Sequence, residues 1–218
     1  MPKLTIEILK REAQAFSRAE SLHSEKSLFG ITDGKAVGTY LEHKFKNYLR
    51  TKYNFEGGNS ASGIDFPDLL VDMKVTSINQ PQSSCPFKSA RQKIYGLGYS
   101  LLVFVYEKKD NAKSKTATLK ILHTIFVDAS RTADYLMTKG LMGILESGGE
   151  KLDLINFMIE RNLPIDEMEA DKLADEILTN PPMLGFLTIS NALQWRLQYP
   201  KVIERAGLED GVVLVYRA

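Results

Sequence analysis

The sequence of 218 residues contains one cysteine, Cys85, and this scarcity removes several classes of protein from consideration. A single cysteine can form neither an internal disulfide nor a cysteine-rich zinc site. No stretch approaches the roughly 18 consecutive apolar residues that a membrane-spanning helix needs. The opening segment, MPKLTIEILKREAQ, becomes charged too early for a secretory signal peptide. These absences predict a cytoplasmic protein in a reducing compartment.

Histidine is scarce as well, and no glycine-rich phosphate loop of the GxxxxGK type is present. The three histidines, His23, His43 and His123, are far apart in the chain, and we interpret them as structural or surface groups. We interpret Cys85 as a packing residue rather than a nucleophile. The missing phosphate loop argues against a hydrolase of small phosphoesters.

The net charge of +1 conceals a strong asymmetry along the chain. Residues 1–145 hold 21 Lys and Arg against 14 Asp and Glu, whereas residues 146–176 hold 3 against 10. A basic part joined to an acidic part is compatible with a polyanion bound on one side of the molecule. Two ordinary solvated surfaces explain the charges equally well, so charge permits nucleic-acid binding without requiring it.

Hydrophobic periodicity predicts an α/β fold with a central mixed sheet and a helical part near the C-terminus. Thr32 or Asp33 offers an N-cap for the second helix, and Pro181 and Pro182 end the last of the clustered helices. Residues 78–93 are polar and predict a loop that leads into a short helix. The predicted helices are 3–27, 35–50, 131–147, 151–161 and 167–178, with one polar-faced helix or two short pieces over 188–207; the predicted strands are 71–76, 99–107, 117–128 and 211–218.

The segment GIDFPDLLVDMKVT, residues 63–76, places charges within an apolar strand. Side chains alternate across a strand, so Asp72 and Lys74 point to the same face. Asp65 has the wrong parity for an unbroken strand, but Pro67 is unsuited to a central strand and predicts a turn. A turn at this proline would return Asp65 to the side of Asp72.

Two converging carboxylates with a neighbouring ammonium group predict a metal-dependent hydrolytic site. Like charges held close repel unless a cation neutralises them, and Mg²⁺ prefers oxygen ligands while keeping several waters. Lys74 could hold an attacking water and offset charge that builds on a phosphate. The alternative is a half-exposed edge strand on which Asp72 and Lys74 form a solvent-exposed salt bridge.

The predicted helix 35–50 adds two further candidates. Lys35 and Glu42 are seven residues apart and therefore nearly aligned on the helix, beside its apolar stripe. Glu42 could bind a metal through water or anchor the lysines. A solvated helix edge is the alternative interpretation.

Residues 34–76 resemble a known family of nucleases. The glycine–lysine helix start with the sequence GKAVGTYLE, the linker GGNSASG and the run DFPDLLVDMKVT are similar to the MutH mismatch-repair endonuclease and to MutH-like type II restriction enzymes. Both belong to the PD-(D/E)XK nucleases. The resemblance implies a restriction-endonuclease-like core and fades beyond residue 76.

The resemblance also implies roles for individual residues. Asp65 and Asp72 would be ligands of Mg²⁺, with the backbone carbonyl of Met73 as a third. Asp72 stands where MutH has a glutamate, and Asp68 is the competing first ligand. The implied catalytic set is Asp65, Asp72, Lys74, Glu42 and Lys35, with Lys74 as the catalytic lysine, Glu42 as the helix carboxylate and Lys35 as an accessory lysine near the phosphate.

Two polar segments carry the side chains that DNA recognition uses. Gln and Asn can pair with adenine, and Arg and Lys with guanine, through the major groove. Plain surface loops are the alternative, and Trp195 is a core or interface residue rather than a base-stacking one. The candidates are Asn79, Gln80, Gln82, Ser83, Ser84, Lys88, Arg91 and Lys93 after the charged strand, and Ser190, Asn191, Gln194 and Arg196 further on, with Arg131 and Lys139 as possible phosphate contacts.

The sequence thus predicts a Mg²⁺-dependent type II restriction endonuclease that leaves 5′-phosphate and 3′-hydroxyl ends. Residues 1–130 would form the catalytic lobe, and residues 131–218 a mainly helical lobe that contributes to DNA binding, or the two form one continuous domain. The expected partners are double-stranded DNA, a second copy of the chain or none, and a cognate DNA methyltransferase. A MutH-like strand-nicking enzyme and a non-catalytic DNA-binding module are the alternatives.

Overall fold

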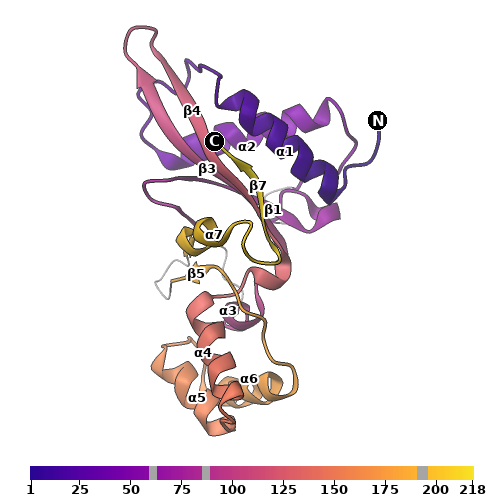
Figure 1. The fold of residues 1–218 in the computed structure, drawn as a ribbon, viewed down its shortest axis with the longest axis vertical. Coiled ribbons are helices and arrows are strands. Elements are labelled where there is room, and N and C mark those ends of the chain that lie inside the picture. Colours follow the sequence, from indigo (N-terminus) through magenta and orange to yellow (C-terminus); the bar gives the residue numbers. More distant parts are fainter. Residues whose placement is uncertain (59–62, 85–88, 191–195) are drawn as a thin grey trace.

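A computed structural model describes residues 1–58, 63–84, 89–190 and 196–218 of the chain. The molecule is elongated, with a sheet-containing part that holds both termini and a lobe of helices at the other end (Figure 1). No helix within the described ranges is both long enough and apolar enough to cross a membrane.

The central sheet has four strands in the order β1-β3-β4-β7. Strand β1 (Val71–Ser77) runs parallel to β3 (Ser100–Asn111), which forms an antiparallel hairpin with β4 (Thr116–Val127). Strand β7 (Val212–Arg217) pairs antiparallel with β4 at the far edge. The sheet is therefore mixed, as the sequence predicts, and β1 is its edge strand.

Two helices cover one face of this sheet. Helix α1 (Ile6–Glu20) packs against β4 and β7, and α2 (Gly34–Arg50) packs against β1. Asp33 is the N-cap of α2, because its side chain accepts a hydrogen bond from the Lys35 N–H. The apolar stripes of both helices join one core with β1, β3 and β4. The first helix ends at Glu20 rather than continuing to residue 27.

The opposite face is covered by a second, smaller sheet and a short helix. Strands β2 (Gln82–Ser84), β6 (Arg196–Gln198) and β5 (Thr188–Ile189) form this sheet in the order β2-β6-β5, and α7 (Pro200–Arg205) follows β6. Their buried residues share a core with the other face of β3 and β4. The predictions of a plain loop over 78–93 and of helical structure throughout 188–207 were wrong where these strands occur, because such short strands show no usable periodicity.

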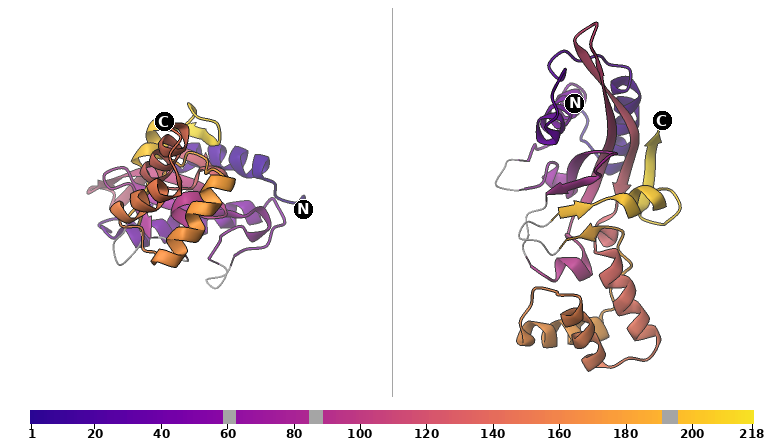
Figure 2. Two further views of the ribbon diagram at one scale, coloured as in Figure 1. Left: turned by 90° about the horizontal axis from the view of Figure 1, so that it is seen from below. Right: turned by 90° about the vertical axis from the view of Figure 1, so that its left-hand side faces the viewer.

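The helical lobe is built from α4 (Tyr135–Glu146), α5 (Lys151–Glu160) and α6 (Glu167–Thr179), with the short α3 (Gln92–Tyr95) packed against α4. It has its own core, which includes Leu141, Leu154 and Met158. The chain then returns to the sheet-containing part, where β7 completes the central sheet (Figure 2). Residues 131–218 are therefore divided between the helical lobe and the sheet-containing part.

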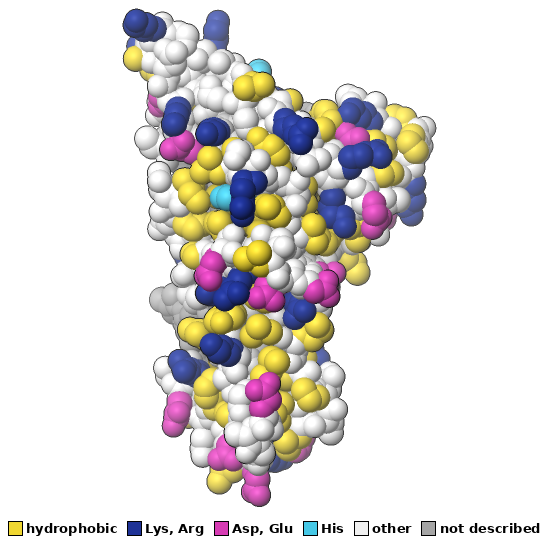
Figure 3. All heavy atoms as spheres, viewed as in Figure 1, with side chains coloured by type: hydrophobic (Ala, Val, Ile, Leu, Met, Phe, Trp, Pro, Cys, Tyr) yellow, Lys and Arg dark blue, Asp and Glu magenta, His cyan; other side chains and the backbone are white. Residues whose placement is uncertain are grey.

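The charge asymmetry of the sequence follows this division. In Figure 3, Lys and Arg side chains are spread over the sheet-containing part, and Asp and Glu side chains are frequent over the helical lobe. The acidic residues 146–176 lie in and around α5 and α6. The acidic part is therefore at the end of the molecule away from the central sheet.

Candidate active site

The candidate site begins with a reversal of the chain immediately before β1. Phe66 and Val71 exchange two backbone hydrogen bonds, with N···O distances of 2.9 and 3.2 Å. Between them lies a single 3-10 turn, η1 (Pro67–Leu69), and Leu70 adopts a left-handed φ of 51° that closes it. Proline suits the first position of such a turn because its fixed φ is already helical and it has no N–H to satisfy. The reversal predicted from Pro67 is present.

This reversal brings Asp65 back against β1. One oxygen of Asp65, Oδ2, accepts the Met73 N–H at 2.9 Å, and the other forms an ion pair with Lys46 of α2. The Asp65 carboxyl also interacts electrostatically with the neighbouring Asp72 carboxyl. Burial alone would raise the pKa of Asp65, but the hydrogen bond from Lys46, the interaction with Asp72 and the hydrogen bond from the Met73 N–H hold it below its ordinary value.

Asp72 and Lys74 point to the same side of β1, as strand alternation requires. Lys74 Nζ lies 2.8 Å from Asp72 Oδ2, and the Asp72 side chain is only 5 % exposed. Burial raises the pKa of Asp72 to about 6, against the attraction of Lys74 and together with its contact to Asp65. The half-exposed edge strand proposed as the alternative does not describe this pair.

Glu42 of α2 lies within electrostatic reach of the same groups. Burial, followed by the negative charge of Asp65, raises the pKa of Glu42 to about 7, although Lys74 and Lys46 oppose the shift. Perturbed carboxyl groups that share charged neighbours are typical of functional sites. The side chain of Lys35, in contrast, is exposed, and within the described residues no contact joins it to these carboxylates.

Lys46 is a member of this cluster that the sequence analysis did not identify. It lies one turn after Glu42 on α2, and residues four apart share a helix face. That spacing was the available signal, but it points equally to a solvated ion pair. What makes Lys46 part of the cluster is Asp65, which the reversal at Pro67 brings to it.

The donor set fits a hard divalent cation with oxygen ligands. Asp65 and Asp72 converge, and Asp72 Oδ2 is buried without a well-aligned hydrogen bond. In the described part of the chain, no three His, Cys, Asp or Glu side chains gather as metal ligands. A cation here would therefore rely on two carboxylates, a backbone carbonyl such as that of Met73, and water or phosphate oxygens, which suits Mg²⁺.

The structure brings two of the predicted DNA-binding segments together in one small sheet. Gln82 and Ser84 lie in β2 and pair in register with Gln198 and Arg196 of β6. These two segments were separate candidates in the sequence, and the small sheet makes them neighbours. Lys88, Asn191, Gln194 and Trp195 lie outside the described residues, as does Cys85.

Other predicted contacts are engaged within the protein. Arg91 makes a two-pronged interaction with Glu176 of α6, with Nε 3.0 and 3.1 Å from its carboxylate oxygens. Lys93 is 4 % exposed, and burial lowers its pKa, with Asp134 opposing. Lys93 is therefore not presented to a ligand at the surface.

Arg131 and Lys139 also have neighbours in the protein. Arg131 Nε donates to the Asp210 carbonyl at 2.9 Å, and Lys139 Nζ lies 5.7 Å from the centre of the Tyr135 ring. Arg131 is therefore engaged within the protein, whereas the Lys139 side chain is exposed.

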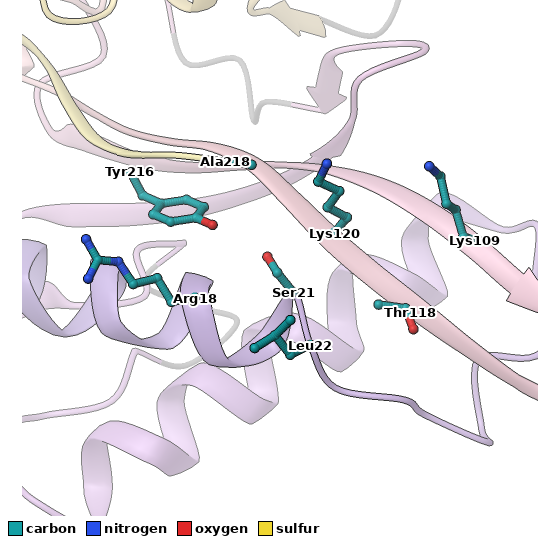
Figure 4. A pocket seen from close by; sticks show the side chains of 8 residues that line it. All are labelled: Arg18, Ser21, Leu22, Lys109, Thr118, Lys120, Tyr216 and Ala218. Atoms are coloured by element: carbon teal, nitrogen blue, oxygen red, sulfur yellow. The ribbon is translucent and has the colours of Figure 1, made fainter.

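A hollow of about 480 Å³ lies away from the carboxylates, between α1, the β3–β4 hairpin and β7 (Figure 4). Its lining includes Arg18, Leu22, Lys120 and Tyr216 and contains no Asp or Glu side chain. It therefore lacks the chemistry for metal-assisted hydrolysis.

Comparison with known proteins gives a consistent assignment. Residues 3–214 match the family described as type II restriction enzyme NspV. The type II restriction enzyme NspV of Nostoc sp. (strain ATCC 29411 / PCC 7524) is 70% identical over 217 residues, which cover 100% of this chain and 99% of that protein. No solved structure matches.

Proposed function

This chain belongs to the family of type II restriction enzyme NspV, and from that premise we propose that Asp65, Asp72 and Lys74 form its active site. A type II restriction enzyme is a site-specific deoxyribonuclease, so the chain is an enzyme that binds DNA. Membership of this family favours a restriction endonuclease over the two alternatives raised by the sequence, a strand-nicking repair enzyme and a non-catalytic DNA-binding module. We also propose the catalytic residues, the use of Mg²⁺ and the 5′-phosphate and 3′-hydroxyl ends of the cut DNA.

The observation that carries the proposal is the convergence of Asp65 and Asp72 beside Lys74. A buried pair of carboxylates in contact is unfavourable unless protons or cations compensate it. In the structure, two ammonium groups, those of Lys46 and Lys74, supply the compensation. An edge strand does not need buried charged groups for its stability, so this cluster favours a functional role.

Each residue has a role in hydrolysis that follows from its position. Lys74, held beside Asp72, can orient a water toward the phosphorus and offset negative charge on the phosphate. Asp65 and Asp72 would hold Mg²⁺, which when bound supplies positive charge to the phosphate oxygens. Glu42 lies within electrostatic reach of Lys46 and Lys74 and can anchor both ammonium groups. Attack in line with the 3′ oxygen would leave 5′-phosphate and 3′-hydroxyl ends.

Cleavage of plasmid and bacteriophage DNA tests this proposal. The protein should cut at fixed sites with Mg²⁺ and lose the activity in EDTA. Asp72→Asn and Lys74→Met should each reduce the single-turnover rate by about 100-fold or more, the scale for removing a group that stabilises a transition state. Asp68→Asn, which changes the neighbouring acid, is the matched control and should retain activity. Full activity in Asp72→Asn would refute the assignment.

A further inference from the structure

The small sheet has two faces of opposite character. Residues directly opposite in antiparallel strands place their side chains on the same face. Gln82 and Thr188 both pair with Gln198, and Ser84 pairs with Arg196. These five residues therefore share one face, which we call the outer face.

The other face is apolar and attached to the core. Leu197 pairs with both Ser83 and Ile189, and Leu197 and Ile189 are 0 % and 3 % exposed. The Ser83 hydroxyl lies 2.5 Å from the hydroxyl of buried Tyr199. The inner face is thereby fixed, and the outer face is turned toward solvent.

The outer face has hydrogen-bonding capacity that the described part of the chain does not use. Within the described ranges, no hydrogen bond or ion pair engages the side chains of its five residues. Ser84 and Arg196 are exposed, and the other three residues are partly exposed. Two amides, two hydroxyls and a guanidinium thus stand side by side with no side-chain partner among the described residues.

One buried residue joins this sheet to the candidate active site. Thr76 lies two residues after Lys74 on β1, so its side chain is on the same side of the strand. The Thr76 hydroxyl accepts the Gln82 N–H at 2.9 Å and lies 3.2 Å from the Gln82 carbonyl oxygen. The start of β2 is therefore held at a fixed position relative to Lys74.

We infer that the outer face reads base edges in the major groove of the DNA that is cut at Asp65, Asp72 and Lys74. The inference rests on the proposed function for the location of the cut. A two-stranded β-ribbon such as the β2–β6 pair fits the major groove, where arginine pairs with guanine and glutamine with adenine. Arg196 accordingly reads a guanine, Gln82 and Gln198 read adenines, and Ser84 and Thr188 complete the contacts. Thr188 and Gln198 were not among the sequence candidates.

The position of Thr76 limits which bases this face can reach. Two residues along a strand span about 7 Å, which is about two base-pair steps of 3.4 Å. The bases read by Gln82 should therefore lie within a few base pairs of the cleaved bond. The outer face would then read the base pairs of the recognition sequence that lie nearest to the cleaved bond.

The test is to sequence the ends that each variant produces from a DNA library randomised around the wild-type site. Gln198→Ala should relax an adenine position, and Arg196→Ala a guanine position, by about 5- to 160-fold in discrimination, the range expected for one bidentate contact. Arg196→Lys keeps the charge but loses the two-pronged geometry, so it should relax the same guanine position. Lys120→Ala removes an exposed strand cation on β4 and should leave every base preference unchanged.

The outcomes separate this inference from the proposed function. If Gln198→Ala and both Arg196 variants cut with wild-type base preferences, the outer face does not read sequence, whatever their overall rate. If Asp72→Asn still cuts, the active site is misassigned, but the effect of Gln198→Ala on the cut sequence can still be measured. A thermal unfolding curve for each variant confirms that folded protein is compared.

Discussion

The ammonium group of Lys46 forms an ion pair with Asp65, the carboxylate that also accepts the Met73 N–H. Both partners are largely buried, with side-chain exposures of 15 % and 18 %. A lysine in this position neutralises a carboxylate that we assign as a metal ligand. Lys46 and a divalent cation would therefore compete for the same negative charge.

Replacing Lys46 with methionine should expose this competition. In EDTA, Lys46→Met should lower the stability of the protein by about 1–3 kcal/mol, because it leaves a largely buried carboxylate oxygen without its hydrogen-bond donor. Mg²⁺ should raise the melting temperature of the variant more than that of the wild type, since binding to the folded state stabilises it. Thermal unfolding with and without Mg²⁺ measures both effects.

Lys44→Met is the matched control for this measurement. Lys44 lies on the same helix and pairs with Glu20 at 2.8 Å, outside the Asp65–Asp72 cluster. Its loss should lower the melting temperature equally in EDTA and in Mg²⁺. Equal Mg²⁺ responses in wild type, Lys46→Met and Lys44→Met would contradict the competition.

Thr76 provides a test of how the small sheet is positioned. Thr76→Val keeps the branched shape but removes the acceptor of the Gln82 N–H, which should cost about 1–2 kcal/mol of stability. If Thr76 also holds β2 in place for DNA, the single-turnover cleavage rate should fall while the Mg²⁺ dependence stays unchanged. Thr76→Ser should restore the rate because it restores the hydroxyl. A variant that is destabilised but cuts at the wild-type rate would limit Thr76 to a structural role.

The ionisation of Glu12 should make the stability of the protein depend on pH. Its carboxylate accepts hydrogen bonds from Tyr48 and Tyr53 at 2.7 Å and from Lys52 at 2.8 Å, which join α1 to α2 and the turn after it. Burial opposes the shift, but the hydrogen bonds from Lys52, Tyr48 and Tyr53 lower the pKa of Glu12 to about 2. The folded state therefore favours the ionised form.

A carboxyl whose pKa is lowered by folding stabilises the protein above its unfolded pKa and loses that effect as the pH falls. The contribution of Glu12 should be complete above about pH 4.5 and should disappear as the pH approaches 2. Its size should be about 2 kcal/mol, allowing for solvent screening at half-exposed Lys52. Denaturant unfolding of wild type and Glu12→Gln between pH 2 and 7 should show a difference that closes on acidification. A difference independent of pH would contradict this assignment.

Long elements with a strong local signal could be predicted from the sequence. The apolar runs of β3 and β4, the amphipathic stripe of α2 and the N-cap at Asp33 are all encoded by residues close in the chain. The reversal before β1 was predictable for the same reason, because Pro67 restricts its own backbone. Local sequence determines these features directly.

Features that depend on distant partners were not predictable. Strands β5 and β6 have two and three residues, too few to show an alternation, and β6 forms by pairing with β2, far away in the chain. Lys93 lies among polar residues in the sequence, yet it is buried where the Asp134 N–H bonds to its carbonyl. Lys46 likewise joins the site only because Asp65 folds back to it. In each case the decisive contact is made in the tertiary structure.

We assign Asp65 and Asp72 as shared ligands of one divalent cation beside Lys74, and anomalous scattering from crystals grown with Mn²⁺ can locate that cation. An anomalous peak is expected about 2 Å from an oxygen of each carboxylate, with Lys46 displaced from Asp65. Crystals in which Mn²⁺ binds elsewhere, with Lys46 and Lys74 still paired to the two aspartates, would contradict it.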